Sequence, residues 1–367
     1  MFTTTKNKLP TKRLLLTPGP MDIAFDVKKA LMRRVVHHRT DEFKQLFGSF
    51  NKKLQKVFFT KNPVLTLHCV GTGAMEASMV NLVLPDDKIL ILKNGVFSKR
   101  WVSIADAYGF KYDVLEFPYG SAINTDTLKK TLIKNGKKYK AVFLNHVETS
   151  TGVLNNVEEI ARIIKKYSNA FIVLDAMASV GAEKLYIDKW GIDIAFTSSC
   201  KALGNIAGLS FIAVSHKALN FIKKHKTKSF YFDFDRIYRY YEDNQTPFTC
   251  SSGLIYAQDR ALDRIIKKGI KKVWGETKIR AEYFRNIMSK SGLKLFAENP
   301  ANALTAIKIN RADSIVNLMR KKFGITIANG QERLKGKIIR ISHMGSVSKK
   351  DLYVTFKALI AVFGGNR

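Results

Sequence analysis

The sequence predicts an α/β protein in which a mostly parallel sheet is covered by helices on both faces, followed by a smaller C-terminal α+β domain. Apolar runs alternate with helical patterns over more than half of the 367 residues, as in sheets built from strand–helix–strand units. A hydrophobic fraction of 46% is sufficient for a large buried core. Past about residue 265 helices surround only a few short strands, which predicts a second domain.

Short apolar runs alternate with segments of helical periodicity along the first part of the chain. The apolar runs predict strands at 63–70, 88–92, 112–117, 139–145, 171–174, 192–197 and 209–214. Helical patterns predict helices at 74–84, 98–108, 125–134 and 157–166, the last because Ile160, Ile163 and Ile164 recur at helical spacing. Ligands are expected beyond the carboxyl ends of such strands.

The C-terminal part predicts helices at 257–268, 273–290 and 314–323, with strands at 304–309 and 337–341. The first 20 residues resemble an arm that ends in a Pro- and Gly-rich turn. The predicted domains are therefore an arm over residues 1–20, a large domain over 21–265 and a small domain over 266–367.

The chain is strongly basic: Lys and Arg outnumber Asp and Glu by 62 to 30, a formal net charge of +32. Basic pairs such as Lys165-Lys166 and Lys223-Lys224 recur on polar faces of the expected helices, which favours a solvated surface over a nucleic-acid groove. A basic nucleic-acid-binding protein remains an alternative. The charge should steer anionic ligands toward the protein.

Neither a membrane segment nor a metal site is expected. No run of about 18 apolar residues occurs, and Met1 to Lys8 lacks the apolar core of a secretory signal. The three cysteines, Cys69, Cys200 and Cys250, are too few and too scattered for a disulfide framework or a zinc cluster. The sequence therefore predicts a cytoplasmic protein without a metal ion.

Two residues at predicted strand ends indicate a cofactor. Lys201 follows the strand 192–197, and Asp175 ends the apolar run that begins at Phe171. A lysine at a strand end can form a Schiff base with an aldehyde cofactor, and a neighbouring carboxylate can hold a pyridine nitrogen protonated. Both features suit pyridoxal 5′-phosphate (PLP). The alternative role for Asp175 is that of a structural cap.

Further strand-end residues can contribute to such a site. Gly71 and Thr72 join a strand to a helix start, where backbone N–H groups can bind a phosphate, although an ordinary turn would use the same residues. Phe97 can stack on a planar ring, with core packing as the alternative, whereas core packing is expected for Trp101. Hydroxyls and a carboxylate in the run His146 to Gly152 can contact a cofactor or cap a helix.

Arg340 stands alone as a charged residue within the apolar run Ile338-Ile339-Arg340-Ile341. A buried arginine is costly unless an anion satisfies it, and its planar fork suits a carboxylate. An internal salt bridge is the alternative to a substrate carboxylate.

Taken in order, these segments resemble the class V aminotransferases, a branch of the fold-type-I PLP enzymes, and especially their alanine–glyoxylate, serine–glyoxylate and serine–pyruvate group. Each motif is weak alone, but the ordered set is specific and covers nearly the whole chain. The matching runs are Leu16 to Pro20, His38 to Phe43, Gly71 to Glu76, Asn94 to Trp101, Glu148 to Leu154, Asp175 to Gly181, Lys201 to Leu203, Gln245 to Thr249, and Arg340.

The resemblance implies a ping-pong transamination from a small amino acid, such as alanine or serine, to a 2-oxo acid such as glyoxylate or pyruvate. It implies that Lys201 binds PLP covalently and moves the Cα proton, and that Asp175 pairs with the ring nitrogen. It further implies a homodimer with shared active sites. The remaining implied contacts are Phe97 on the cofactor ring, Thr149 beside it, Gly71 and Thr72 at its phosphate, Thr249 at the phosphate of the neighbouring subunit, and Arg340 at the substrate carboxylate.

Cys200 departs from the family pattern, because many relatives have a glutamine before the lysine that can bind the cofactor phosphate. A thiol is a poor substitute, so this phosphate contact is in doubt, and a packed, inert thiol is expected. The first alternative function is an aminotransferase for a phosphonate or phosphorylated donor. A cysteine desulfurase is disfavoured, because no cysteine follows Cys250.

Overall fold

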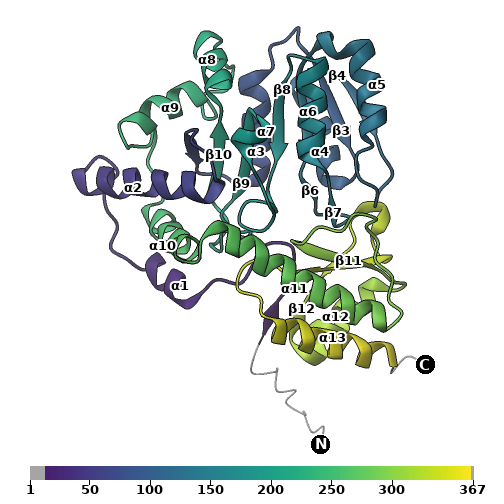
Figure 1. The fold of residues 1–367 in the computed structure, drawn as a ribbon. Coiled ribbons are helices and arrows are strands. Elements are labelled where there is room, and N and C mark those ends of the chain that lie inside the picture. Colours follow the sequence, from purple (N-terminus) through teal and green to yellow (C-terminus); the bar gives the residue numbers. More distant parts are fainter. Residues whose placement is uncertain (1–12, 365–367) are drawn as a thin grey trace, which may run out of the picture.

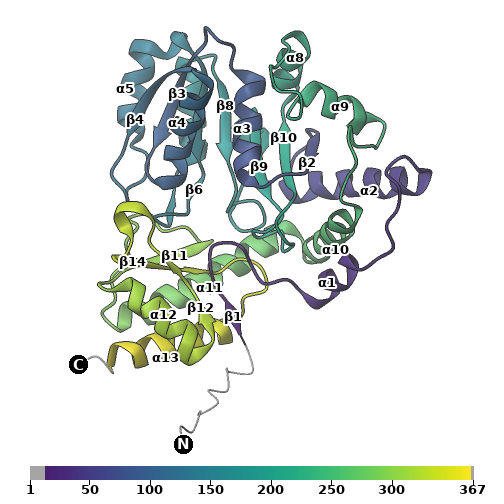
Figure 2. The same ribbon diagram turned by 180° about the vertical axis from the view of Figure 1, so that it is seen from behind.

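The computed structural model describes residues 13–364, and its centre is a seven-stranded sheet (Figures 1 and 2). The strand order is β2-β10-β9-β8-β5-β3-β4. All neighbouring strands run parallel except β10, which is antiparallel to both β2 and β9. The strands are β2 (Val64–Leu67), β3 (Lys88–Lys93), β4 (Lys111–Glu116), β5 (Tyr139–Asn145), β8 (Phe171–Asp175), β9 (Ile194–Ser198) and β10 (Ser210–Val214).

Helices cover both faces of this sheet because successive strand residues point to opposite sides. Within β5, Leu144 packs in one buried cluster and Phe143 in another. The Leu144 face is covered by α2 (Asp41–Phe58), α5 (Thr125–Asn135), α6 (Val157–Tyr167) and α10 (Ser252–Lys268). The Phe143 face is covered by α3 (Gly71–Leu82), α4 (Val96–Tyr108), α8 (His216–Lys224) and α9 (Phe234–Glu242).

The C-terminal elements form a separate layer below the carboxyl ends of the parallel strands (Figure 1). An antiparallel sheet of order β11-β14-β13 combines Leu304–Lys308, Ile338–Ser342 and Ala328–Asn329. Three helices pack on one face of it: α11 (Ile270–Lys290), α12 (Ala312–Phe323) and α13 (Lys349–Gly364). The N-terminal strand β1 (Leu14–Leu15) pairs with β12 (Ile325–Thr326), and Leu16 lies in the core of this layer.

The predicted fold class is confirmed, since the large sheet is mainly parallel and has helices on both faces. The antiparallel direction of β10 was not anticipated, nor were the short α1 (Phe25–Leu31) and α7 (Ile187–Trp190). The domain boundary at residue 265 stays a prediction, and α10 continues past it to Lys268. Residues 1–12 of the predicted arm lie outside the described residues.

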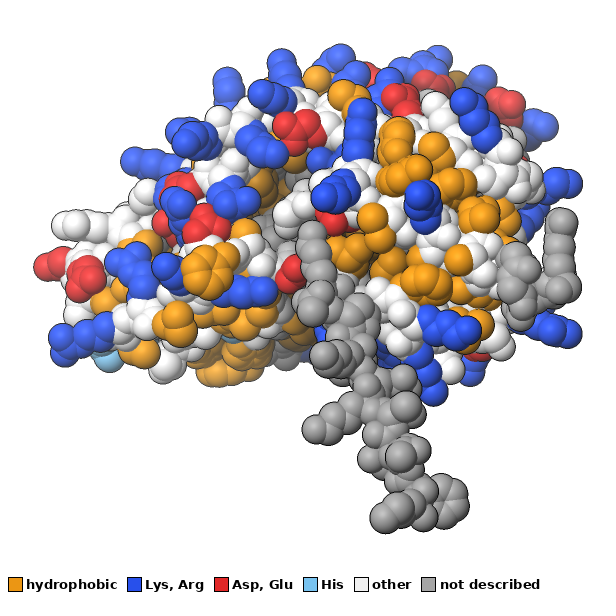
Figure 3. All heavy atoms as spheres, turned by 90° about the horizontal axis from the view of Figure 1, so that it is seen from below, with side chains coloured by type: hydrophobic (Ala, Val, Ile, Leu, Met, Phe, Trp, Pro, Cys, Tyr) orange, Lys and Arg blue, Asp and Glu red, His pale blue; other side chains and the backbone are white. Residues whose placement is uncertain are grey.

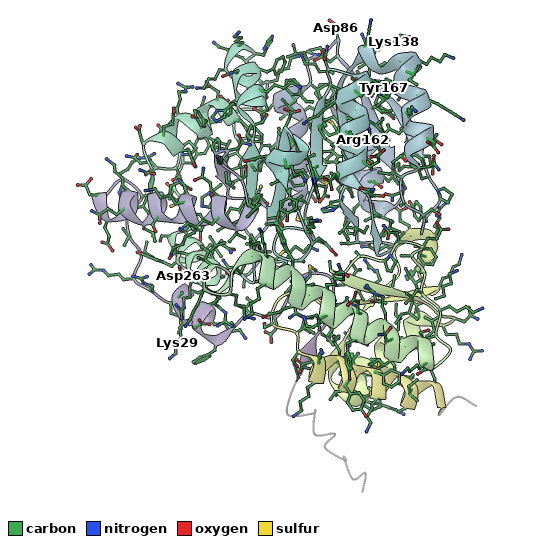
Figure 4. All side chains as sticks on the ribbon, viewed as in Figure 1. Lys29, Asp86, Lys138, Arg162, Tyr167 and Asp263 are labelled. Carbon is green, nitrogen blue, oxygen red and sulfur yellow. The ribbon has the colours of Figure 1, made fainter. Side chains whose placement is uncertain are left out.

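The basic side chains are spread over the outside of the molecule. Lys29, Lys138 and Arg162 project from different elements at its periphery (Figure 4). On the face seen from below, Lys and Arg are interspersed with acidic and apolar side chains (Figure 3). Among residues 13–364, no helix is long and apolar enough to cross a membrane.

Candidate active site

The carboxyl edge of the large sheet collects the side chains singled out from the sequence. Asp175 is the last residue of β8, and Lys201 follows the end of the adjacent strand β9 by three residues. The positive charge of Lys201 acts to lower the pKa of Asp175, and the negative charge of Asp175 acts to raise the pKa of Lys201. The carboxyl ends of β8 and β9 face the C-terminal layer (Figure 1). The positive charge of Arg340, in that layer, contributes to lowering the pKa of Lys201.

The ε-amine of Lys201 is held by the N-terminal segment. Its Nζ donates a hydrogen bond to the carbonyl oxygen of Pro18 at 2.7 Å. Gly19 has a φ of +135°, and a Cβ there would overlap the amine, so only glycine permits this approach. Burial lowers the pKa of Lys201, and the charges of Cys200 and Asp175 offset part of this decrease. A larger fraction of the amine is therefore neutral than in water.

Asp175 is 4% exposed and has no basic side chain in direct contact among the described residues. Its Oδ1 accepts a hydrogen bond from the backbone N–H of Met177 at 2.8 Å. Burial raises the pKa of Asp175 to about 7, and the nearby Glu148 adds to this rise. A cation placed against this carboxylate would lower its pKa again, so the position suits a protonated ring nitrogen.

Glu148 is a structural cap rather than a cofactor contact. Its buried carboxylate accepts hydrogen bonds from the backbone N–H groups of Phe97 at 3.2 Å and Ser98 at 2.8 Å, which begin helix α4. It also accepts from the Ser150 hydroxyl at 2.6 Å. The carboxylate thus satisfies the free donors at the helix start and fixes the position of the Phe97 backbone.

The two aromatic residues of α4 differ in burial. Trp101 is fully buried, with its Nε1 donating to Asn145 Oδ1 at 3.0 Å, and packs on Phe143. Phe97 is only partly buried, so its ring is accessible for stacking. The guanidinium of Arg100 lies over this ring, 5.0 Å from its centroid.

Gly71 and Thr72 form the first residues of α3, whose N-terminus has no side-chain cap. A Cβ on Gly71 would overlap the end of the Met177 side chain, which would have to move to make room. The Thr72 hydroxyl accepts a hydrogen bond from Arg100 Nη1 at 3.2 Å. An uncapped helix start with a hydroxyl and a cation beside it suits an anionic group.

Arg340 lies on β14 and is 6% exposed. Its Nε and Nη2 donate to the carbonyl of Asn329 at 2.9 and 2.7 Å, and Nη1 donates to the carbonyl of Thr149 at 2.9 Å. Among the ion pairs of residues 13–364 none involves Arg340, so the internal salt bridge is absent there. One N–H on each of Nη1 and Nη2 has no acceptor within the described protein.

Arg340 therefore retains donors for a ligand. Burial lowers the pKa of its guanidinium to about 10, and Glu148 opposes the shift. The group stays charged at neutral pH. Thr149 is buried, and its main contact with Arg340 is through its backbone carbonyl, so its hydroxyl remains available.

Cys200 and Thr249 differ from the rest of the site. Cys200 is partly buried, with Sγ 3.3 Å from the hydroxyl of Ser198. Thr249 is exposed in the loop between α9 and α10, where Arg39 binds the neighbouring carbonyls of Thr246 and Pro247. Among residues 13–364, Thr249 makes no hydrogen bond with Lys201, whose amine binds the Pro18 carbonyl.

Three residues of the site are not predicted from the sequence, although each lies within a run that resembles the family. Pro18 contributes a carbonyl, Met177 packs on Gly71, and Arg100 contacts Thr72. The backbone contact of Pro18 leaves no signal in residue type. Arg100 could have been noticed as a cation one helical turn from the predicted stacking aromatic.

The site fits PLP. A buried lysine amine with a lowered pKa and a buried carboxylate without a cationic partner suit the aldehyde and the ring nitrogen of this cofactor. A partly exposed aromatic ring and an uncapped helix start suit its ring face and its phosphate. In residues 13–364 no three His, Cys, Asp or Glu side chains are grouped so that they could hold a metal ion.

Fold and site together define the class, a PLP-dependent enzyme of fold type I. The model of the class V aminotransferases matches residues 21–352. The chain belongs to this family.

Known relatives span almost the whole chain. This chain is 35% identical over 356 residues to a protein from Synechococcus named "Soluble hydrogenase, small subunit". The match covers 96% of this chain and 93% of the relative. The chain is 28% identical to the L-aspartate–glyoxylate aminotransferase of Paracoccus denitrificans, covering 91% and 87%. The crystal structure of alanine–glyoxylate aminotransferase from Nostoc matches with a TM-score of 0.91 at 27% identity, covering 96% and 95%.

Proposed function

We propose that this aminotransferase moves the amino group of a small amino acid, alanine, serine or a similar donor, to a 2-oxo acid such as glyoxylate or pyruvate. The observation that carries the proposal is the meeting of Lys201 and Asp175 at one sheet edge, with the free donors of Arg340 nearby. The aspartate–glyoxylate and alanine–glyoxylate relatives support glyoxylate as the acceptor.

Lys201 is the proposed proton carrier. Bound PLP supplies an electron sink for the negative charge that develops at the substrate Cα. Because burial lowers the pKa of Lys201, its free Nζ can accept the Cα proton and return it. The carbonyl of Pro18 at 2.7 Å gives Nζ a defined position while it is not bonded to the cofactor.

Asp175 and the residues around it are proposed to hold the cofactor. The Asp175 carboxylate would pair with the ring nitrogen and keep it protonated. Phe97 would stack on one face of the ring, and the hydroxyl of Thr149 would lie beside it. Gly71 and Thr72 would offer N–H and hydroxyl donors to the phosphate at the start of α3.

Arg340 is proposed to bind the substrate carboxylate through the two N–H groups that lack protein acceptors. A guanidinium binds a carboxylate with directional, charge-assisted hydrogen bonds. The carbonyls of Asn329 and Thr149 hold the guanidinium in place before the substrate arrives, so little reorganisation is required.

The test is a donor panel with the purified protein. Alanine, serine, aspartate and glutamate are added in turn, and the visible band of the bound cofactor and the 2-oxo acid product are measured. A true donor changes the spectrum without an acceptor present, and parallel lines in double-reciprocal plots would establish the ping-pong order. Lys201→Ala should abolish turnover, whereas Lys130→Ala, at an exposed position, should not. Turnover by Lys201→Ala would refute the mechanism.

The same panel separates the remaining candidate functions. If a phosphonate or phosphorylated donor reacts faster than the small amino acids, the protein is an aminotransferase for that donor class. Release of sulfide from cysteine would indicate a desulfurase. Absence of cofactor together with steeply salt-dependent DNA binding would favour a nucleic-acid-binding protein.

We further propose a homodimer with shared active sites, in which Thr249 reaches the phosphate site of the partner. Several large apolar side chains are strongly exposed, as an interface requires; these are Phe25 at 72%, Met32 at 78%, Val35 at 78% and Phe230 at 68%. Tyr231 stacks on Phe248, beside Thr249, at 5.4 Å.

Mixed dimers test this arrangement. Lys201→Ala and a Thr249→Arg variant should each be poorly active alone. If the sites are shared, mixing them under exchange conditions should restore activity, because one site of the mixed dimer has both intact residues. Sedimentation gives the oligomeric state, and the absence of complementation in verified mixed dimers would count against sharing.

A cytoplasmic location is proposed as well. Cys69, Cys200 and Cys250 are all free thiols in the structure, as a reducing compartment permits. Cell fractionation followed by immunodetection would test this location.

A further inference from the structure

Arg100 is a cation without an anionic partner beside the proposed phosphate site. Arg100 is partly exposed, and its guanidinium lies between the exposed Thr72 hydroxyl, 3.2 Å from Nη1, and the Phe97 ring. Among the ion pairs of the described residues none involves Arg100, whereas the adjacent Lys99 pairs with Glu332 at 3.2 Å. A cation without a counter-charge, beside a helix start that has no side-chain cap, favours an anionic ligand at this position.

The surroundings of Arg100 lead to the same point. Thr72 lies in the first turn of helix α3, which has no side-chain cap. The preceding residue, Gly71, lies close to Ser198 at the end of β9, since a Cβ added to Gly71 would be 3.8 Å from the Ser198 Cβ. The Ser198 hydroxyl in turn contacts Cys200 Sγ. The positive charge of Arg100 also contributes to lowering the pKa of both Asp175 and Lys201.

We propose that Arg100 binds the phosphate of PLP together with Thr72, and so supplies the contact that Cys200 cannot make. This inference rests on the proposed cofactor. The planar guanidinium can donate two parallel hydrogen bonds to phosphate oxygens, whereas a thiol is only a weak donor. In this chain the phosphate would thus be held from α4 as well as from the start of α3.

The test compares PLP with pyridoxal, which has the same ring and aldehyde but no phosphate. Apoprotein of wild type, Arg100→Gln and Arg100→Lys is titrated with each compound, and binding is followed by the visible spectrum. Arg100→Gln should raise the Kd for PLP roughly 10- to 100-fold, as expected for the loss of a hydrogen bond to a charged group. Its Kd for pyridoxal should stay within about twofold.

Arg162 provides a matched control on the outside of α6, where it pairs with Glu159 at 2.6 Å (Figure 4). Arg162→Gln should bind both compounds as the wild type does. Arg100→Lys keeps the positive charge but lacks the planar guanidinium. It should therefore raise the Kd for PLP less than Arg100→Gln does. If Arg100→Gln does not fold, the lysine variant still tests the proposal, because a loss confined to PLP is expected there too.

Inorganic phosphate gives a second measurement on the unmodified site. It should compete with PLP for the wild-type apoprotein and compete less well for the Arg100 variants. An unchanged Kd for PLP, or equal weakening of PLP and pyridoxal, would overturn the proposal. Failure of the wild-type protein to bind PLP at all would instead reject the proposed cofactor, so the two failures are distinguishable.

Discussion

Replacement of Arg340 tests how the substrate is held. Arg340→Gln removes the positive charge and the two N–H groups, one on Nη1 and one on Nη2, that have no acceptor in the described protein. Each hydrogen bond to a carboxylate contributes about 1.5–3 kcal/mol. Two of them contribute about 3–6 kcal/mol, which corresponds to roughly a 10²- to 10⁴-fold fall in kcat/KM for alanine.

The assay must separate lost binding from a distorted site, because Arg340 also holds the carbonyls of Asn329 and Thr149. Ethylamine lacks the carboxylate and serves as the comparison donor. Half-reaction rates are measured with alanine and ethylamine, for the wild type, Arg340→Gln and the charge-preserving Arg340→Lys. The preference for alanine should collapse in Arg340→Gln and fall by less in Arg340→Lys.

A folded Arg340→Gln protein whose kcat/KM for alanine falls less than tenfold would refute this role of Arg340. The role would equally be refuted if both donors were slowed by the same factor, because that pattern indicates general distortion. Arg320→Gln, at an exposed position on α12, should leave both rates unchanged.

Three further predictions concern packing and protonation. Gly95→Ala places a Cβ that overlaps the Glu148 side chain, and should destabilise the protein by about 1–3 kcal/mol in urea unfolding; unchanged stability would contradict the helix-cap assignment. Gly19→Ala combines a φ of +135° with overlap at the Lys201 amine, and should reduce cofactor incorporation in the visible spectrum, with secondary structure retained by circular dichroism. Burial raises the pKa of Glu183 to about 7 from an ordinary 4.5, so its stability contribution is greatest below about pH 4.5 and is lost as the pH rises through 7. Relative to wild type, Glu183→Gln should therefore be more stable at pH 8 than at pH 5, by up to about 3 kcal/mol; equal differences at both pH values would show that Glu183 does not titrate in this range.

Much of the fold was predictable because its signals are local. The apolar run at 139–145 matches β5 residue for residue, and the helical spacing of Ile160, Ile163 and Ile164 matches the buried side of α6. The antiparallel direction of β10 was not predictable, because an apolar run of five residues has the same appearance in either direction.

The candidate site was predictable in part for a topological reason. Carboxyl ends of parallel strands meet at one edge, so polar residues that end strands, such as Asp175, are brought together by the fold class itself. Alternatives for single residues were decided only by contacts. Glu148 caps α4, and Arg340 has no ion pair within residues 13–364.

The sequence by itself determined the fold class, the family and the chemistry available at the strand ends, because each depends on residue type and order along the chain. Only the tertiary structure decided which groups meet. Pro18 reaches Lys201 across 183 residues, and Thr149 reaches Arg340 across 191. Both contacts use backbone carbonyls, which every residue type possesses, so they arise from packing of the two layers and leave no mark on the sequence.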